Sequence, residues 1–480
     1  MKKTKIVSLA LSAALFLSVV GCGGGGLSQG AEDYEPSKIR DPKEVYAVSY
    51  DIIGGKDSMP IGAFQGPFTA SSGINGQAFP DYVSDEFFKL IQACGVNLLV
   101  YPHEFYNANP SSVTKALKLS EKYDMGYFVM HSYFRSVVNT KSVDMEKLSS
   151  IIELFTQYRS FAGIHTVDEP KTPLFEGLGV LNDAFYSLGL KNLHTYSNMY
   201  PTYDFMEIDY TGGTEGTITY EEYVDRYIRQ TRPKILSYDH YVFQAYDNSY
   251  RSNVEYYFRN LSVIRSKAEE YKLPFWVYVQ AGGHWNDAAV EIPIIEHFPN
   301  ESEFIWNVST QLAYGAKGIQ YFPLFQSYEY AMGENGEWDF GRNGLFGTFG
   351  NLNQWYFYAQ KANRHIACVD HVLMNAVNEG VIATGSAVKD IGELPECIQS
   401  GKYYELQKVD GDALVGCFNY RGRTALYVVN YSMTDKQTVR LSFDGDYGYE
   451  VVQRTQTAEV VGNEIPLTLE AGEGALIVLK

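Results

Sequence analysis

Eight short apolar segments recur along the chain, and each has the length and residue content of a strand buried on both faces. They span residues 60–64, 96–101, 125–131, 161–170, 193–198, 235–239, 275–280 and 318–322. Between them, apolar residues repeat at three- and four-residue spacing, which is typical of a helix with one buried face. Alternating strands and helices favour a parallel sheet, because a helix is the usual connection between neighbouring parallel strands. Eight such units predict a (β/α)8 barrel.

An open, doubly wound sheet is the rival architecture. It predicts a glycine-rich dinucleotide-binding turn after the first strand, and residues 62–66 do not have that pattern. The predicted helices also have clear ends. The helix before the second strand carries apolar residues at positions 87, 90, 91 and 94, and Gly95 follows where helices stop. We therefore favour the closed barrel and place it at residues 46–373.

The pattern changes near residue 373. Short segments of alternating character at 413–418, 425–430 and 475–479 replace the strand and helix repeat. Turn-forming pairs, at 410–411, 421–422 and 444–445, lie between or beside them. We predict that residues 374–480 form a small antiparallel β-sandwich packed against the barrel.

The N-terminus reads as a targeting segment. Residues 1–5 are basic, residues 6–20 are apolar, and the run ends on Gly21-Cys22. This resembles a bacterial lipobox, in which Cys22 becomes the lipidated first residue of the mature protein. An ordinary signal peptide with an accidental cysteine is the alternative. We expect residues 1–22 to be a lipoprotein signal peptide and 23–45 a flexible tether. The protein is then expected in the bacterial cell envelope, held to a membrane by the lipid alone.

Composition narrows the choice of partners. The net charge of −18 argues against a nucleic-acid partner, because phosphate binding requires concentrated Lys and Arg. No cysteine pair has metal-ligand spacing, and we predict neither a metal nor a cofactor. Tyrosine is abundant, with 39 residues. Aromatic side chains near loops suit carbohydrate, because a sugar ring has apolar faces.

Polar and acidic residues gather where the predicted strands end. In a barrel of this class the carboxyl ends of the strands form the active face. Asp168 and Glu169 end the fourth strand, and Asp239 ends the sixth. Glycosidic cleavage usually needs two carboxyl groups, and Glu169 and Asp239 are the candidates. The candidate substrate-binding residues are Asp168, His131, Asn198, Tyr238, Tyr241, Gln280 and Trp285.

Four segments carry a family resemblance: residues 166–170, 236–241, 274–280 and 311–322. With the late β-region, they resemble the clan A glycoside hydrolases, and more closely a group of bacterial β-galactosidase-like proteins. The resemblance covers about residues 46–480. It implies a barrel enzyme that acts on a carbohydrate, and it does not specify the sugar.

The resemblance also implies residue roles. Glu169 matches the clan's acid/base glutamate, and Asp168 stands where the clan usually has Asn. Gln280 stands where the clan has its nucleophilic glutamate, and an amide cannot act as one. We therefore assign the second carboxylate to Asp239. Two alternatives stay open: a substrate-assisted N-acetylhexosaminidase-like enzyme, and a non-catalytic glycan-binding lipoprotein on a degenerate barrel. A lipoprotein that acts only as a scaffold is weaker.

Overall fold

The computed structural model describes residues 58–69, 80–102, 104–203, 207–243, 254–283, 297–326 and 343–480. The predicted signal peptide with Cys22, the tether, and Trp285 lie outside the described residues. Among the helices in those ranges, none is both long and apolar enough to cross a membrane.

Eight parallel strands form the barrel, in the order β5-β4-β3-β2-β1-β8-β7-β6. Their bounds are β1 Ile61–Phe64, β2 Leu98–Tyr101, β3 Gly126–Val129, β4 Phe161–Asp168, β5 His194–Asn198, β6 Leu236–Tyr238, β7 Phe275–Gln280 and β8 Gly318–Phe322. A bridge between Met199 and Tyr238 joins the two ends of the sheet, and the Met199 amide donates to the Ser237 carbonyl at 2.8 Å. The predicted (β/α)8 barrel is therefore confirmed.

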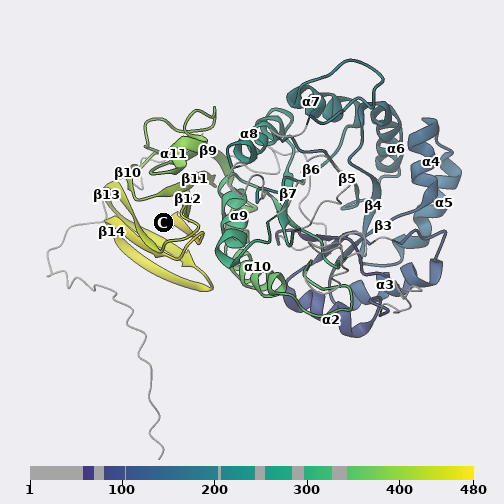
Figure 1. Ribbon diagram of the computed structural model, residues 1–480, viewed down its shortest axis with the longest axis horizontal. Coiled ribbons are helices and arrows are strands. Elements are labelled where there is room, and N and C mark those ends of the chain that lie inside the picture. The colour runs from purple at the N-terminus through teal and green to yellow at the C-terminus, as the bar shows by residue number, and fades with distance from the viewer. Residues whose placement is uncertain are drawn as a thin grey trace, which may run out of the picture.

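Helices surround these strands (Figure 1). They are α2 Asp85–Cys94, α3 Pro110–Lys122, α4 Ser132–Thr140, α5 Met145–Thr156, α6 Phe175–Ser187, α7 Tyr220–Thr231, α8 Val254–Tyr271, α9 Glu301–Ala313 and α10 Gln354–Leu373, with a 3-10 turn at Thr172–Leu174. Local signals set their ends. Asn300 and Glu303 form a reciprocal capping box at the start of α9. Gly95 ends α2 with a φ of 91°, as predicted.

The inside of the barrel is filled by a separate set of apolar and aromatic side chains. It contains Phe64, Leu98, Val100, Phe128, Ala162, Tyr196, Ile235, Trp276 and Tyr278. In β4 the alternation of inward and outward residues is broken at Gly163, whose φ is 134°. A Cβ there would lie 1.9 Å from the His194 carbonyl oxygen, so only glycine fits. As a result, both Ala162 and His165 contact the barrel interior.

The C-terminal region forms one seven-stranded antiparallel sheet. Its elements are β9 Val377–Ala383, α11 Ala387–Ile391, β10 Leu406–Asp410, β11 Ala413–Tyr420, β12 Arg423–Asn430, β13 Gln437–Gln453, β14 Gln456–Leu469 and β15 Gly474–Leu479. The long β13 pairs first with β10 and then with β15, so the sheet closes over a core of its own. The turn predicted at 444–445 is wrong. These residues lie inside β13, where the register with β14 shifts between Ser442 and Tyr447.

The β-region packs beside the barrel against α9 and α10 (Figure 1). The approach is close: a Cβ on Gly416 of β11 would lie 2.2 Å from the carbonyl oxygen of Ala313 at the end of α9. Tyr427 of β12 belongs to the same apolar cluster as Trp306 of α9. The two regions therefore share a core.

Candidate active site

Three carboxyl groups meet at the carboxyl end of the barrel. Asp168 ends β4, Glu169 follows it, and Asp239 follows β6. In β6 the alternation of the strand points Ser237 and Asp239 to the inside. The three groups interact electrostatically, because the Asp239 charge raises the pKa of both other acids. The topology thus brings the two predicted catalytic carboxyls, Glu169 and Asp239, into one site.

The backbone at Glu169 is unusual. Its φ is 45°, in the left-handed region that costs a residue with a side chain about 1–2 kcal/mol. Its amide donates to the carbonyl of Asn198 in β5 at 2.8 Å, which holds the turn in place. The strand predicted over 161–170 therefore ends at Asp168. Strain that the surrounding structure maintains is common at functional sites.

Both acids of this turn favour the protonated form. Burial, then the charges of Asp239 and Asp168, raise the pKa of Glu169 to about 9. Burial and Asp239 raise the pKa of Asp168 to about 7. Although protein surrounds Asp168, its surface is exposed to solvent at the barrel end, and water there offsets part of the desolvation. Glu169 is therefore the stronger candidate for a proton donor at neutral pH.

A buried hydrogen-bond network lies behind Asp239. Asn198 Nδ2 donates to Asp239 Oδ1 at 2.7 Å, and Ser237 Oγ donates to Asn198 Oδ1 at 2.9 Å. Gln320 Nε2 of β8 donates to Ser237 Oγ at 2.8 Å, and the Tyr196 hydroxyl donates to Gln320 Oε1 at 2.7 Å. Donation from Asn198 fixes the orientation of the Asp239 carboxyl group.

This network was missed by the sequence interpretation, which named only Asn198 among the residues behind Asp239. Tyr196, Ser237 and Gln320 lie mid-strand in three different strands, each buried to at least 95%. One signal was present in the sequence: a polar residue inside an apolar strand, which must find a partner when buried. The partners depend on strand register, and the sequence does not show it.

Aromatic rings lie beside the carboxyl groups. Phe64 and Tyr101 stack with ring centroids 4.3 Å apart, and Phe322 packs against Phe64 at 5.7 Å. Tyr241 lies 5.5 Å from Phe322 and is partly exposed, which fits its predicted place in the site. Burial and the three acids raise the pKa of Tyr200 to about 12, so this partly exposed tyrosine also faces them.

The prediction that Tyr238 binds substrate is wrong. We predicted a substrate contact, yet its side chain is fully buried and belongs to the cluster between barrel and helices. The charges that act on it include Tyr257 of α8 and Tyr220 of α7. Because Ser237 points inward, its neighbour Tyr238 must point outward.

Gln280 is held by the fold. Its Oε1 accepts from the Phe243 amide at 3.1 Å, and its Nε2 donates to the carbonyls of Phe243 and His297 at 3.2 and 2.9 Å. These bonds use both amide hydrogens, and only 2% of the residue is exposed. The predicted role of Gln280 in binding substrate is therefore corrected. It ties the segment after β6 to the segment that precedes α9.

His131 caps a helix. Its Nδ1 accepts a hydrogen bond from the Tyr133 amide at 3.0 Å, and His131 is the N-cap residue of α4. Burial, then the Lys147 charge, lower the pKa of His131, so the ring is neutral at pH 7. Its contacts lie with Tyr106 and Phe134 rather than with the acids. The predicted sugar contact from His131 has no support in this arrangement.

Two mid-strand histidines lie in the core. His165 and His194 are buried, with 2% and 5% exposed. The ring nitrogens of both have no hydrogen-bond partner among the described residues. Burial lowers the pKa of His165 to about 3 and that of His194 to about 4, and both are neutral. Trp276 packs inside the barrel.

The described residues do not contain a group of three or more His, Cys, Asp or Glu side chains that is arranged to hold a metal ion. Cys94, Cys368, Cys397 and Cys417 are free thiols.

No family model matches the chain, and no curated protein matches it. Solved structures with similar architecture include a putative alpha-galactosidase from Bacteroides fragilis, with 9% identity, 88% of this chain and 79% of that chain covered, and a TM-score of 0.45. A maltogenic alpha-amylase from Thermotoga neapolitana has 11% identity, 88% and 99% coverage, and a TM-score of 0.44.

A β-L-arabinopyranosidase from Geobacillus stearothermophilus has 9% identity, with 88% of this chain and 97% of that chain covered, and a TM-score of 0.44. Similarities of this size are too distant to transfer an activity, a substrate or the role of a residue. The function must be argued from the site itself.

Proposed function

We propose that this protein is a lipid-anchored glycoside hydrolase that cleaves an extracellular oligo- or polysaccharide. The observation that carries the proposal is that two carboxyl groups lie in different surroundings at the barrel end. Glu169 has a pKa raised to about 9, and Asp239 receives a hydrogen bond from Asn198. In this proposal Glu169 donates the proton and Asp239 acts as the anion. Glycosidic cleavage requires both.

Each group then has a distinct role. Glu169 protonates the glycosidic oxygen as the bond breaks, and Asp239 either attacks the anomeric carbon or activates a water. One strand lies between β4 and β6 in the barrel, so their backbones are about 10 Å apart, and side chains span the rest. That separation is compatible with both stereochemical outcomes. Asp168 accepts a hydrogen bond from a sugar hydroxyl. The rings of Tyr241 and Tyr200 pack against the apolar face of the sugar.

The test is product release from a panel of glycans and aryl glycosides, with wild type beside Glu169→Gln and Asp239→Asn. Loss of a general acid usually lowers turnover about 10²–10⁴-fold. Glu153→Gln, at an exposed position on α5, makes the same chemical change outside the site and is the matched control. Equal turnover in Glu169→Gln and wild type would refute the assignment.

A glycan-binding protein without catalysis is the second candidate. The observation that favours it is Gln280, an amide at the end of β7 whose hydrogen bonds are all made within the fold. The barrel position that carries the clan's nucleophile is thus closed to chemistry. Glycan binding by wild type, with no product from any panel member after long incubation, would favour this candidate.

The substrate-assisted mechanism is the third candidate. Asp168, Glu169 and Asp239 could fill its roles, but Tyr238, which precedes Asp239, faces the helices and lies outside the site. Turnover of N-acetylhexosaminides, with no turnover of the matching hexosides, would restore it.

The anchor is a separate part of the proposal and rests on the sequence around Cys22. Radiolabelled palmitate is expected to be incorporated into wild type and not into Cys22→Ala. Equal labelling of both proteins would contradict lipidation at this position.

A further inference from the structure

A pocket lies between the barrel and the β-region, on the outer face of α10. Its volume is about 390 Å³, which is within the range of small-molecule sites. Three structural units form its walls: α10, α9 and the strand ends of the β-region. The lining residues include Phe357, Gln360, Lys361, Arg364, His365, Tyr427, Arg454 and Glu473.

The back wall of the pocket is rigid. His365 of α10 bridges to the β-region, with Nδ1 2.8 Å from the Arg454 carbonyl and Nε2 3.0 Å from the Tyr427 hydroxyl. A carbonyl oxygen can only accept, so Nδ1 carries the proton and Tyr427 donates to Nε2. Burial lowers the pKa of His365, which keeps it neutral. The pocket is thus preformed by an inter-region hydrogen-bond chain.

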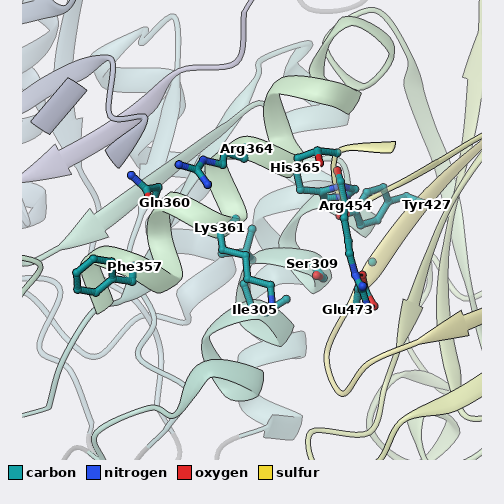
Figure 2. A pocket seen from close by; sticks show the side chains of 14 residues that line it. Ile305, Ser309, Phe357, Gln360, Lys361, Arg364, His365, Tyr427, Arg454 and Glu473 are labelled. Atoms are coloured by element: carbon teal, nitrogen blue, oxygen red, sulfur yellow. Dashed lines mark hydrogen bonds and ion pairs between the residues drawn. The ribbon is translucent and has the colours of Figure 1, made fainter. Parts of the chain in front are cut away.

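The pocket contains three cations, two of which are already paired. Arg454 Nε contacts Glu473 at 2.7 Å, and Lys361 Nζ contacts Glu301 at 2.6 Å. Arg364 is exposed and has no ion pair among the residues that the structure describes. Figure 2 shows Arg454 turned toward Glu473, and the Arg364 guanidinium extended in the other direction, toward Gln360. One guanidinium with five donors is left for a ligand.

An aromatic ring lies on the same face of the helix. Phe357 has 53% of its surface exposed, although its residue type is usually buried. Phe357 and Arg364 are seven residues apart, two turns, or about 10 Å along the helix. Gln360 lies between them, as Figure 2 shows, and donates one amide hydrogen to the Ala93 carbonyl at 2.7 Å. Its oxygen and second hydrogen remain for a hydroxyl.

We propose that this pocket binds an acidic glycan, with a sugar ring on Phe357 and the carboxylate or sulfate of a neighbouring unit on Arg364. The guanidinium forms paired hydrogen bonds to two oxygens of such an anion, and the aromatic ring covers an apolar sugar face. The site is distinct from the barrel end, where Asp168, Glu169 and Asp239 lie. It does not depend on catalysis by Glu169.

The experiment is calorimetric titration of the full chain carrying Glu169→Gln, so that no ligand is consumed. The probes are tetragalacturonate, a chondroitin sulfate tetrasaccharide and neutral cellotetraose. We expect one or both acidic probes to bind in preference to cellotetraose, with an affinity that falls as salt rises. Comparing the affinities of tetragalacturonate and the chondroitin sulfate tetrasaccharide shows whether a carboxylate or a sulfate is the recognised group.

Substitutions then locate the binding. Arg364→Ala is expected to weaken binding of the acidic probe about tenfold or more. Arg364→Lys should weaken it less, because lysine keeps the charge and loses only the paired hydrogen bonds of the guanidinium. Phe357→Ala should weaken binding severalfold. Arg159→Ala removes the same charge at an exposed position outside the pocket and should change nothing. All these positions are exposed, and unchanged melting temperatures will show that the variants fold.

Two results would overturn the proposal: failure of both acidic probes to bind, or an acidic-probe affinity that is the same in wild type, Arg364→Ala and Phe357→Ala. Equal affinity for cellotetraose and tetragalacturonate would overturn the acidic class. Each is separable from the proposed hydrolase activity, which is measured at the barrel end with Glu169 intact.

Discussion

Two strands of the same barrel end in opposite ways. β4 ends at an exposed aspartate and a glutamate with a left-handed backbone, and both acids favour the protonated form. β7 ends at Gln280, whose amide is saturated by backbone groups. Both lie at the carboxyl end, where barrels of this class carry their chemistry. The difference teaches that position in the fold does not make a residue functional. Free hydrogen-bonding capacity and a raised pKa are what make Glu169 the candidate.

The largest expected effect comes from making the two strand ends alike. Gln280→Glu would place a carboxylate against the carbonyls of Phe243 and His297, with no donor to replace the lost amide hydrogens. We expect the free energy of unfolding to fall by about 3 kcal/mol or more, because an unpaired buried charge is that costly. Urea denaturation followed by circular dichroism measures the loss.

The matched control for this variant is Gln456→Glu, which makes the same change at an exposed position in β14. Its stability should stay within about 0.5 kcal/mol of wild type. If Gln280→Glu were instead as stable as wild type and gained turnover, the end of β7 would be open to the site, and the contrast with β4 would fail.

A smaller effect is expected from the network behind Asp239. Asn198→Ala removes the 2.7 Å donor to Asp239 and the acceptor for Ser237. Hydrogen bonds to charged groups contribute about 1.5–3 kcal/mol, so kcat should fall about ten- to a hundredfold, with KM less affected. Ser237→Ala, whose hydroxyl lies one hydrogen bond further from Asp239, should lower kcat by a smaller factor. A pH–rate profile that is identical in Asn198→Ala and wild type would mean that Asn198 does not tune Asp239.

Much of the barrel could be predicted from the sequence, because buried parallel strands are short apolar runs whose ends are marked by polar residues. β7 and β8 have the predicted bounds, and β4 ends two residues early, where Glu169 leaves the strand region. Of the late strands, β11, β12 and β15 were predicted, from the segments of alternating character at 413–418, 425–430 and 475–479. The sandwich turn at 444–445 was not, because an aspartate-glycine pair also suits a bulge.

The site was predicted less completely. Acids directly after apolar runs identified Asp168, Glu169 and Asp239. The sidedness of Tyr238 could not be read from a three-residue strand, because alternation has no reference point until the barrel closes. The hydrogen-bond partners of Gln280, Phe243 and His297, lie 37 and 17 residues away in connecting segments. No local sequence pattern indicates them.

The pH dependence of stability separates the two strand ends further. Glu169 and Asp168 have folded-state pKa values raised above those of an unfolded chain. The folded state therefore binds more protons between about pH 4.5 and pH 9, and stability falls as pH rises through that range. We expect Glu169→Gln to flatten this decline in urea titrations at pH 5, 7 and 9. A variant whose slope matches wild type would show that Glu169 ionises normally in the fold.

The smallest effect is expected at Tyr238, which tests the inward and outward assignment of β6. Its hydroxyl is buried and has no hydrogen-bond partner among the described residues, so Tyr238→Phe removes a polar group that gains nothing from burial. We expect stability to be unchanged or raised by up to about 1 kcal/mol, and kcat and KM to match wild type. Tyr241→Phe is the comparison, since Tyr241 lies over Phe322 at the barrel end. A rise in KM for Tyr238→Phe alone would mean that its hydroxyl reaches substrate, and the alternation that places Asp239 inside would have to be reversed.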